Sequence, residues 1–141
     1  MEVINREALI DHFGEWPSFH DAEVYGVRLD SGQRTAGVVS VQLDVHVFAV
    51  DGRLPSGRLN FVKHALVTLE FEDVEALDLE GFGPQNVLDD LVLEPVHLAA
   101  GRQVQVTLPS SNGLEGSFRC RFVTVLDAVP LEPGEHSVYG P

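Results

Sequence analysis

The sequence has little positive charge and almost no cysteine. Its 141 residues contain nine Lys and Arg against 22 Asp and Glu, which gives a formal net charge of −13. Phosphate backbones and anionic membranes are bound by clustered basic residues, so we expect neither nucleic acid nor a membrane as a partner. The single cysteine, Cys120, cannot form an internal disulfide. This favours a reducing compartment, and we expect a cytoplasmic protein.

Long apolar runs are also missing. No stretch approaches the roughly 18 residues that a membrane span needs, and the charged N-terminus does not fit a signal peptide. Hydrophobic residues still make up 44% of the chain, and its length is typical of one domain. We therefore expect a single domain over residues 1–129. Residues 130–141, which are rich in Pro and Gly, predict a flexible tail.

Most of the secondary structure is predicted by alternation with a period of two. Between the strand patterns, Ser110 to Gly113 predicts a hairpin turn and residues 49–61 predict a mobile loop. In the last strand the apolar phase slips after Phe122, for which we expect a bulge or burial of both faces. Strands are expected over residues 22–29, 39–48, 64–72, 75–80, 91–98, 103–108 and 117–128.

Two short helices are expected. The first covers residues 5–13, with Asn5 as its cap and Gly14 as its stop. The second begins after Gly83-Pro84 and covers residues 85–91, because proline suits the first position of a helix. The predicted fold class is therefore α+β, a single antiparallel β-sheet domain with two short helices packed on one side.

Common catalytic signatures are missing from the sequence. The only lysine, Lys63, follows no glycine-rich run, and Cys120 alternates with Phe118 and Phe122 as a core residue would. We expect no catalytic residue, no cofactor and no metal ion, and folding without metal. The rival hypothesis is a small metal-dependent hydrolase, or another enzyme, that uses His20, Asp21 and His46. Adjacent residues on an extended chain point to opposite faces, which disfavours joint chelation by His20 and Asp21.

The segment from Trp16 to Glu23 is unusually rich in aromatic residues and contains the adjacent His20 and Asp21. In one interpretation, Trp16 and Phe19 bury against the sheet while His20 or Asp21 satisfies backbone groups of the loop. In the other, the segment is a recognition loop whose aromatic and charged side chains bind a partner.

This same segment, Trp16-Pro17-Ser18-Phe19-His20-Asp21-Ala22-Glu23-Val24, resembles a signature of the bacterial immunity protein 50 family. The resemblance continues through residues 64–71, 85–88 and 113–120. It implies a cytoplasmic, non-enzymatic antidote that binds and neutralises a cognate toxin of a polymorphic toxin system. It brings no catalytic residues with it.

The distribution of acidic residues indicates where such a toxin would bind. No Lys or Arg occurs between Lys63 and Arg102, whereas nine carboxylates do. A field of one sign favours capture of a basic partner, such as a nuclease, although a solvated face would also keep the protein soluble. A third possibility is a homo-oligomeric interaction module, for example a homodimer. The candidate toxin-binding residues are Asp44, Glu70, Glu72, Asp78, Glu80, His20 and Asp21.

Overall fold

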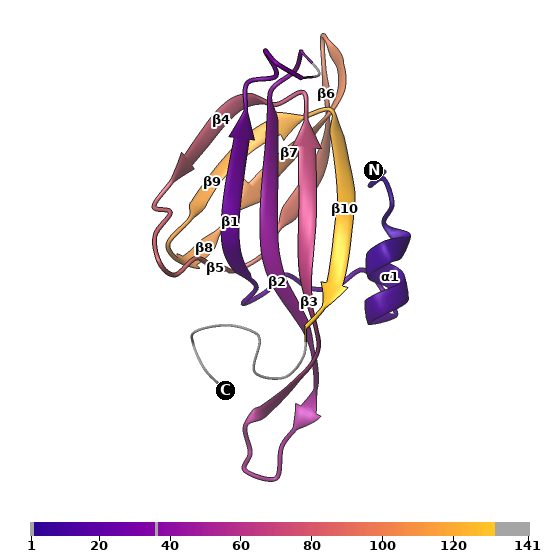
Figure 1. Cartoon of the computed structure of the whole chain (residues 1–141), viewed down its shortest axis with the longest axis vertical. Helices are drawn as coiled ribbons and strands as arrows, with labels where there is room; N and C mark the ends of the chain where they lie inside the picture. Colours follow the sequence, from indigo (N-terminus) through magenta and orange to yellow (C-terminus); the bar gives the residue numbers. More distant parts are fainter. Residues whose placement is uncertain (1, 36, 132–141) are drawn as a thin grey trace.

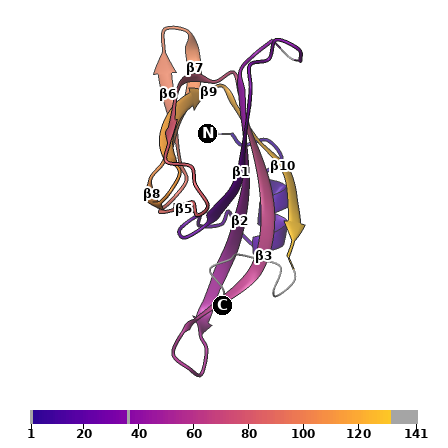
Figure 2. The ribbon, with the colours of Figure 1, turned by 60° about the vertical axis from the view of Figure 1, so that its left-hand side comes forward.

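Two antiparallel sheets pack face to face in the computed structural model, which describes residues 2–35 and 37–131 (Figures 1 and 2). The first sheet has the strand order β10-β3-β2-β1-β5-β8, and the second has the order β4-β9-β7-β6. Strands make up 60% of the chain and helix 5%, so the expected α+β fold with one sheet and two helices is wrong. The elements are α1 (Glu7–Phe13), β1 (Glu23–Asp30), β2 (Ser40–Arg53), β3 (Leu59–Glu72), β4 (Glu75–Glu80), β5 (Val87–Leu88), β6 (Val92–Leu98), β7 (Gly101–Leu108), β8 (Ser110–Asn112), β9 (Glu115–Cys120) and β10 (Phe122–Pro130).

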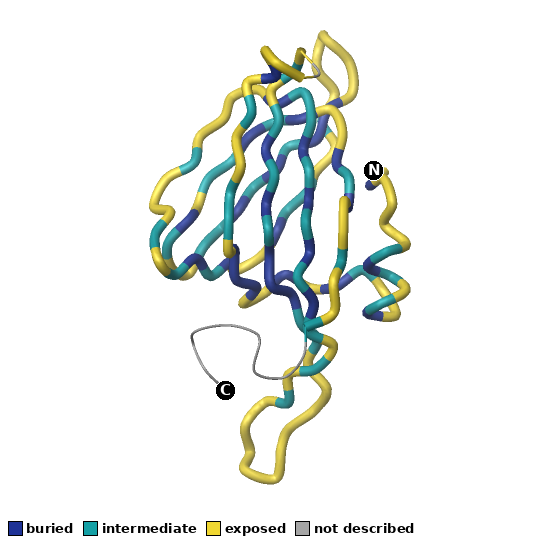
Figure 3. The backbone as a smooth tube through the Cα atoms, in the orientation of Figure 1, coloured by how far each residue is buried: buried dark blue, intermediate teal, exposed yellow. Residues whose placement is uncertain are grey.

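The core lies between the two sheets. Alternate residues of β2 and β3 point inward and are fully buried, among them Leu43, Val45, Val67 and Leu69. The sheets meet where Phe71 of β3 packs edge-to-face against Phe118 of β9, with ring centroids 5.1 Å apart. Burial of these alternate side chains fixes the register of each strand, because a one-residue slip would turn the apolar set toward solvent. Figure 3 shows this alternation along the strands.

The phase slip near Phe122 has a different origin from the expected bulge or two-sided burial. Residues 117–128 do not form one strand: β9 belongs to the second sheet and β10 to the first. The chain crosses between the sheets at Arg121, whose backbone N–H donates to the Glu72 carbonyl. The core lies between the two sheets. When the chain crosses from one sheet to the other, the apolar residues must therefore shift to the other set of alternate positions to keep facing the core.

The expected second helix is absent from the described residues. In its place, Val87 and Leu88 form the short strand β5, and the buried Asn86 side chain joins three segments. Its Oδ1 accepts from the N–H groups of Gly83 and Leu114, while its Nδ2 donates to the carbonyls of Gly83 and Val24. These tertiary hydrogen bonds outweigh the local preference for a helix start after Pro84.

The segment from Ser110 to Gly113 makes more than the expected hairpin turn. The flanking strands β7 and β9 do pair, but β8 between them pairs with β5 of the first sheet. The turn therefore connects the two sheets instead of simply closing a hairpin.

The predicted first helix is confirmed as α1, which begins two residues later than expected, at Glu7, and stops at Phe13 with Gly14 as its C-cap. Asn5 is not its cap; its side chain donates to the Val125 carbonyl, and the cap position is Arg6. Ile4 forms a parallel bridge to Thr124, so this segment follows the edge of β10. α1 lies beside β10 and leaves the outer face of the first sheet open in Figure 1. In the described residues no helix is long and apolar enough to cross a membrane.

The β2–β3 hairpin extends well beyond the sandwich (Figures 1 and 2). Residues 49–61, expected as a loop, are mostly strand, with Ala49 opposite Val62 and Val50 opposite Phe61. At the other end of the chain, β10 runs to Pro130, and the Leu131 N–H donates to the His64 carbonyl. Residues 132–141 of the expected tail lie outside the described residues.

Candidate partner-binding surface

Three predicted acidic residues share the outer face of the first sheet. Asp44 of β2 and Glu70 and Glu72 of β3 alternate with the buried residues of their strands, so they point away from the core. Asp44 lies opposite Thr68, whose hydroxyl donates to Asp44 Oδ1 at 2.8 Å. Asp44, Glu70 and Glu72 form the surface that we call the acidic face.

Glu70 is held in an unfavourable electrostatic environment. Partial burial, followed by the neighbouring charge of Glu72 and a hydrogen bond with that residue, raises the pKa of the Glu70 carboxyl. Each of these effects disfavours the charged form. Among the described residues, no salt bridge is formed by any of the three carboxylates of the acidic face. The negative charge of these three carboxylates is therefore not neutralised by a salt bridge within the described residues.

Asp78 and Glu80 lie elsewhere. They are exposed on β4, an edge strand of the second sheet, so the structure does not join them to the acidic face. Their charge protects this edge against pairing with another strand. Two other carboxylates of the acidic stretch form salt bridges. Asp73 lies 3.1 Å from Arg121, and Glu75 lies 3.6 Å from Arg119. The sequence separation concealed both pairs.

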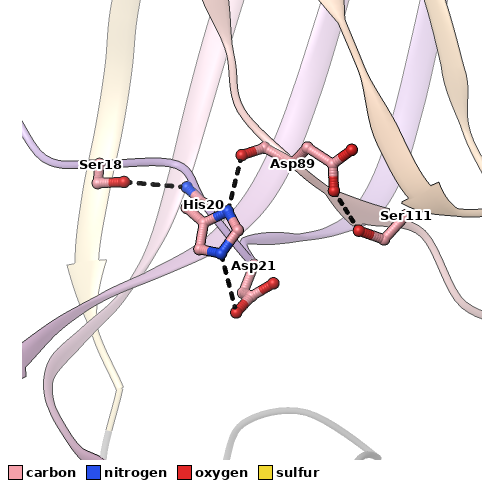
Figure 4. A network of polar contacts seen from close by, with 5 residues as sticks. All are labelled: Ser18, His20, Asp21, Asp89 and Ser111. Carbon is pink, nitrogen blue, oxygen red and sulfur yellow. Dashed lines mark hydrogen bonds and ion pairs between the residues drawn. The ribbon is translucent and has the colours of Figure 1, made fainter.

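His20 and Asp21 are exposed on the loop that precedes β1 (Figure 4). His20 Nδ1 lies 3.0 Å from the Asp89 carbonyl oxygen, and its Nε2 lies 3.6 Å from Asp21 Oδ2. The hydrogen bond to this carbonyl, followed by the charge of Asp21, raises the pKa of His20. The Ser111 hydroxyl in turn donates to the Asp89 side chain. The network ties the loop to the residues after β5, which agrees with the structural interpretation of this segment.

The aromatic residues of this segment are packed as that interpretation requires. Phe19 is fully buried, and Trp16 is half-buried against the core with its ring 5.9 Å from that of Phe19. Phe19 is therefore unavailable to a partner, and only part of Trp16 remains exposed.

His46 belongs to a chain of hydrogen bonds that sequence analysis missed. Its Nε2 lies 2.9 Å from His64 Nδ1, and its Nδ1 lies 3.3 Å from the Tyr25 hydroxyl. His46 is thus bonded to Tyr25 and His64, whereas His20 contacts Asp21 and Asp89. Within the described residues, no group of three or more His, Cys, Asp or Glu side chains could hold a metal ion.

Glu23, directly opposite His46, was not a candidate either. It is buried, and its Oε1 has no hydrogen-bond partner among the described residues. The alternation of β1 and β2 places Glu23 and His46 on one face, but burial of polar side chains there has no signal in the sequence.

The predicted core position of Cys120 is confirmed. The side chain is fully buried, and burial, followed by the charge of Asp73, raises the pKa of its thiol to about 12. A nucleophilic cysteine needs a lowered pKa and an accessible thiolate. Cys120 has neither property.

Comparison with known proteins gives one match. The family model described as Immunity protein 50 matches residues 5–131, which include both sheets and the helix. No curated protein and no solved structure matches the chain.

Proposed function

Because the chain belongs to the immunity protein 50 family, we propose that it is a non-enzymatic antidote that binds a cognate toxin through its acidic face. The toxin surface that it covers is basic, as in an enzyme that acts on nucleic acid. Binding blocks the toxin physically, so the proposal requires neither a cofactor nor a catalytic residue.

The single observation that carries this proposal is the position of Glu70 and Glu72 on an open sheet face. Burial, and after it the neighbouring charge of Glu72, raises the pKa of Glu70; the repulsion between the two carboxylates opposes folding. A face that served only solubility could separate its charges or intersperse them with lysine. A basic partner would relieve the repulsion between Glu70 and Glu72. The arrangement of the two carboxylates would then favour binding.

The acidic face would act mainly on the rate of association. Complementary charge steers encounter and can raise association rates toward 10⁸ M⁻¹s⁻¹ at low salt, against roughly 10⁵–10⁶ M⁻¹s⁻¹ without steering. Rapid capture suits an antidote, because each unbound toxin molecule remains active. Salt should screen the effect, since the carboxylates lie at the surface.

The test compares two double variants with the same change in net charge. Glu70→Lys/Glu72→Lys alters the acidic face, and Asp78→Lys/Glu80→Lys alters the distant edge strand β4. Association with the toxin encoded beside this chain's gene is measured at two salt concentrations. We expect the first variant to lose at least about tenfold in association rate at low salt and to show a flatter salt dependence.

The β4 variant serves as the matched control, and it should lose much less. Equal losses in both variants would mean that net charge, and not the acidic face, governs capture. Unchanged association of the Glu70/Glu72 variant would reject the proposed surface. Unfolding curves of both variants show whether the fold has survived.

A further inference from the structure

The projecting part of the β2–β3 hairpin has no second layer to pack against. We call residues 49–62 the arm. It extends past both sheets in Figures 1 and 2, and almost all of it is exposed in Figure 3. At about 3.3 Å per residue, its two strands reach roughly 20 Å beyond the body.

The arm exposes large apolar side chains, and it is held together by cross-strand pairs and by hydrogen bonds at its tip. Val50 and Phe61 are cross-strand neighbours with exposed fractions of 53% and 45%, and Leu54 and Leu59 near the tip are also exposed. An isolated two-stranded hairpin is marginally stable in water. Contiguous exposed apolar side chains mark a surface that binds something.

The charge of the arm indicates whether it would bind a basic toxin or a second copy of this chain. The arm contains Asp51, Arg53 and Arg58, so its net charge is +1. The whole chain carries −13, so the rest of the chain carries −14. A basic toxin that fits the acidic face would gain no attraction from this arm. The arm instead complements an acidic surface, and the body of a second copy presents one.

The complementary carboxylates lie at the end of the body from which the arm leaves. Glu23 pairs with His46, close to where β2 enters the arm, and the exposed Asp21 is two residues before Glu23. Asp89, whose carbonyl contacts His20, and the adjacent Asp90 are also exposed there. We call Asp21, Asp89 and Asp90 the end cluster.

We propose that two copies of this chain associate end to end, each arm packing its apolar side chains on the partner and placing its arginines beside the partner's end cluster. Because arm and cluster lie at the same end, a two-fold axis forms both contacts at once. Stable interfaces use about 20–30 residues from each partner. The arm supplies 14 of them, and the exposed and half-buried residues of segments 14–22 and 85–90 supply the rest.

This association is independent of toxin binding. Ser40 lies opposite Glu72 and Gln42 opposite Glu70, whereas the arm begins at Ala49 and Val62, near the other end of the hairpin. The acidic face therefore stays open in the dimer. One dimer would present two toxin-binding surfaces, at its far ends.

The first experiment is sedimentation equilibrium of the full chain from about 1 µM to about 500 µM, a range that detects micromolar dissociation constants. We expect a dimer whose dissociation constant rises at least about tenfold in Phe61→Ser and in Leu54→Ser. Leu29→Ser, an exposed leucine on β1, is the matched control and should leave the constant unchanged. Two arm variants are used, and melting curves identify any that fails to fold.

The second experiment exchanges charge between the two contacts. Arg58→Glu on the arm and Asp90→Lys in the end cluster should each weaken self-association, whereas a mixture of the two variants should form a heterodimer. A chain that stays monomeric throughout, or a dimer insensitive to Phe61→Ser and Leu54→Ser, would overturn the proposal. Arm variants that lose toxin binding with unchanged mass would show that the toxin occupies the arm.

Discussion

Nε2 of His46 lies 2.9 Å from Nδ1 of His64 on the neighbouring strand, and the bonds on either side fix which ring donates. His64 Nε2 lies 3.2 Å from the Phe61 carbonyl oxygen, which can only accept, so this nitrogen carries a proton. A neutral His64 therefore accepts at Nδ1, and His46 donates from Nε2. His46 Nδ1 then accepts from the Tyr25 hydroxyl. The chain of bonds runs in one direction, from Tyr25 to the base of the arm.

The first prediction follows from this direction. Both neutral rings should be Nε2–H tautomers, which long-range ¹H–¹⁵N correlation spectra distinguish directly. His64→Leu removes the acceptor of the buried His46 and should cost about 1–3 kcal/mol of unfolding free energy, measured by urea denaturation. His97→Leu, at an exposed position of β6, is the control and should change stability little. An Nδ1–H tautomer at His64 would contradict the derivation.

The second prediction concerns Asn86, which is 2% exposed and joins the loop before β5 to two other segments. Asn86→Ala leaves the buried Leu114 N–H and Val24 carbonyl, and the partly buried N–H and carbonyl of Gly83, without this partner. Each unsatisfied buried group costs about 1–3 kcal/mol, so we expect a total loss of at least about 3 kcal/mol in urea denaturation. Gln85→Ala removes one exposed bond to Asn112 and should cost less than about 1 kcal/mol. Equal losses in the two variants would show that Asn86 does not organise this loop.

The third prediction separates the two aromatic side chains of the loop before β1. Phe19 is fully buried, so Phe19→Ala should cost about 3–5 kcal/mol through lost burial and the cavity left behind. Trp16 is only half-buried, and Trp16→Ala should cost clearly less in the same denaturation experiment. A Trp16 variant of normal stability that no longer binds toxin would instead make Trp16 part of the recognition surface.

The strands could be predicted because their signal is local. Alternation of apolar and polar residues placed β7 and the parts of β2 and β3 that lie in the body, and it identified Cys120 as a core residue. It also placed Glu70 and Glu72 on the outer face of β3, since a half-buried strand turns every second residue outward. What alternation reports is which face of a strand is buried.

The arrangement of the strands into two sheets could not be predicted in this way. Nothing local shows that the chain changes sheets at Arg121, or that Asn86 replaces a helix start with long-range hydrogen bonds. The same limit hid the candidate surfaces: Asp78 and Glu80 share the acidic stretch with Glu70, yet they lie on the other sheet. Residues that are close along this sequence therefore need not share a surface.

The last prediction concerns the pH dependence of His20. Its pKa is raised, first by the hydrogen bond to the Asp89 carbonyl and then by the charge of Asp21, so the protonated ring is favoured in the folded state. A group whose pKa is higher in the folded state stabilises the fold below its ordinary value of 6.5. That contribution is lost as the pH rises through the raised pKa. An NMR titration of the ring protons should therefore give a midpoint above 6.5.

The Asp21→Asn variant separates the two causes of the raised His20 pKa, the hydrogen bond to Asp89 and the charge of Asp21. It removes the carboxylate but keeps the Asp89 carbonyl, so the midpoint of His20 should fall without losing the whole shift. Glu94→Gln removes a carboxylate that does not raise the pKa of His20, and its titration should match the parent. A midpoint unchanged by Asp21→Asn would mean that the 3.6 Å pair does not persist in solution, since an exposed ion pair of this kind is easily screened. The shift of the His20 pKa would then come from the hydrogen bond to the Asp89 carbonyl.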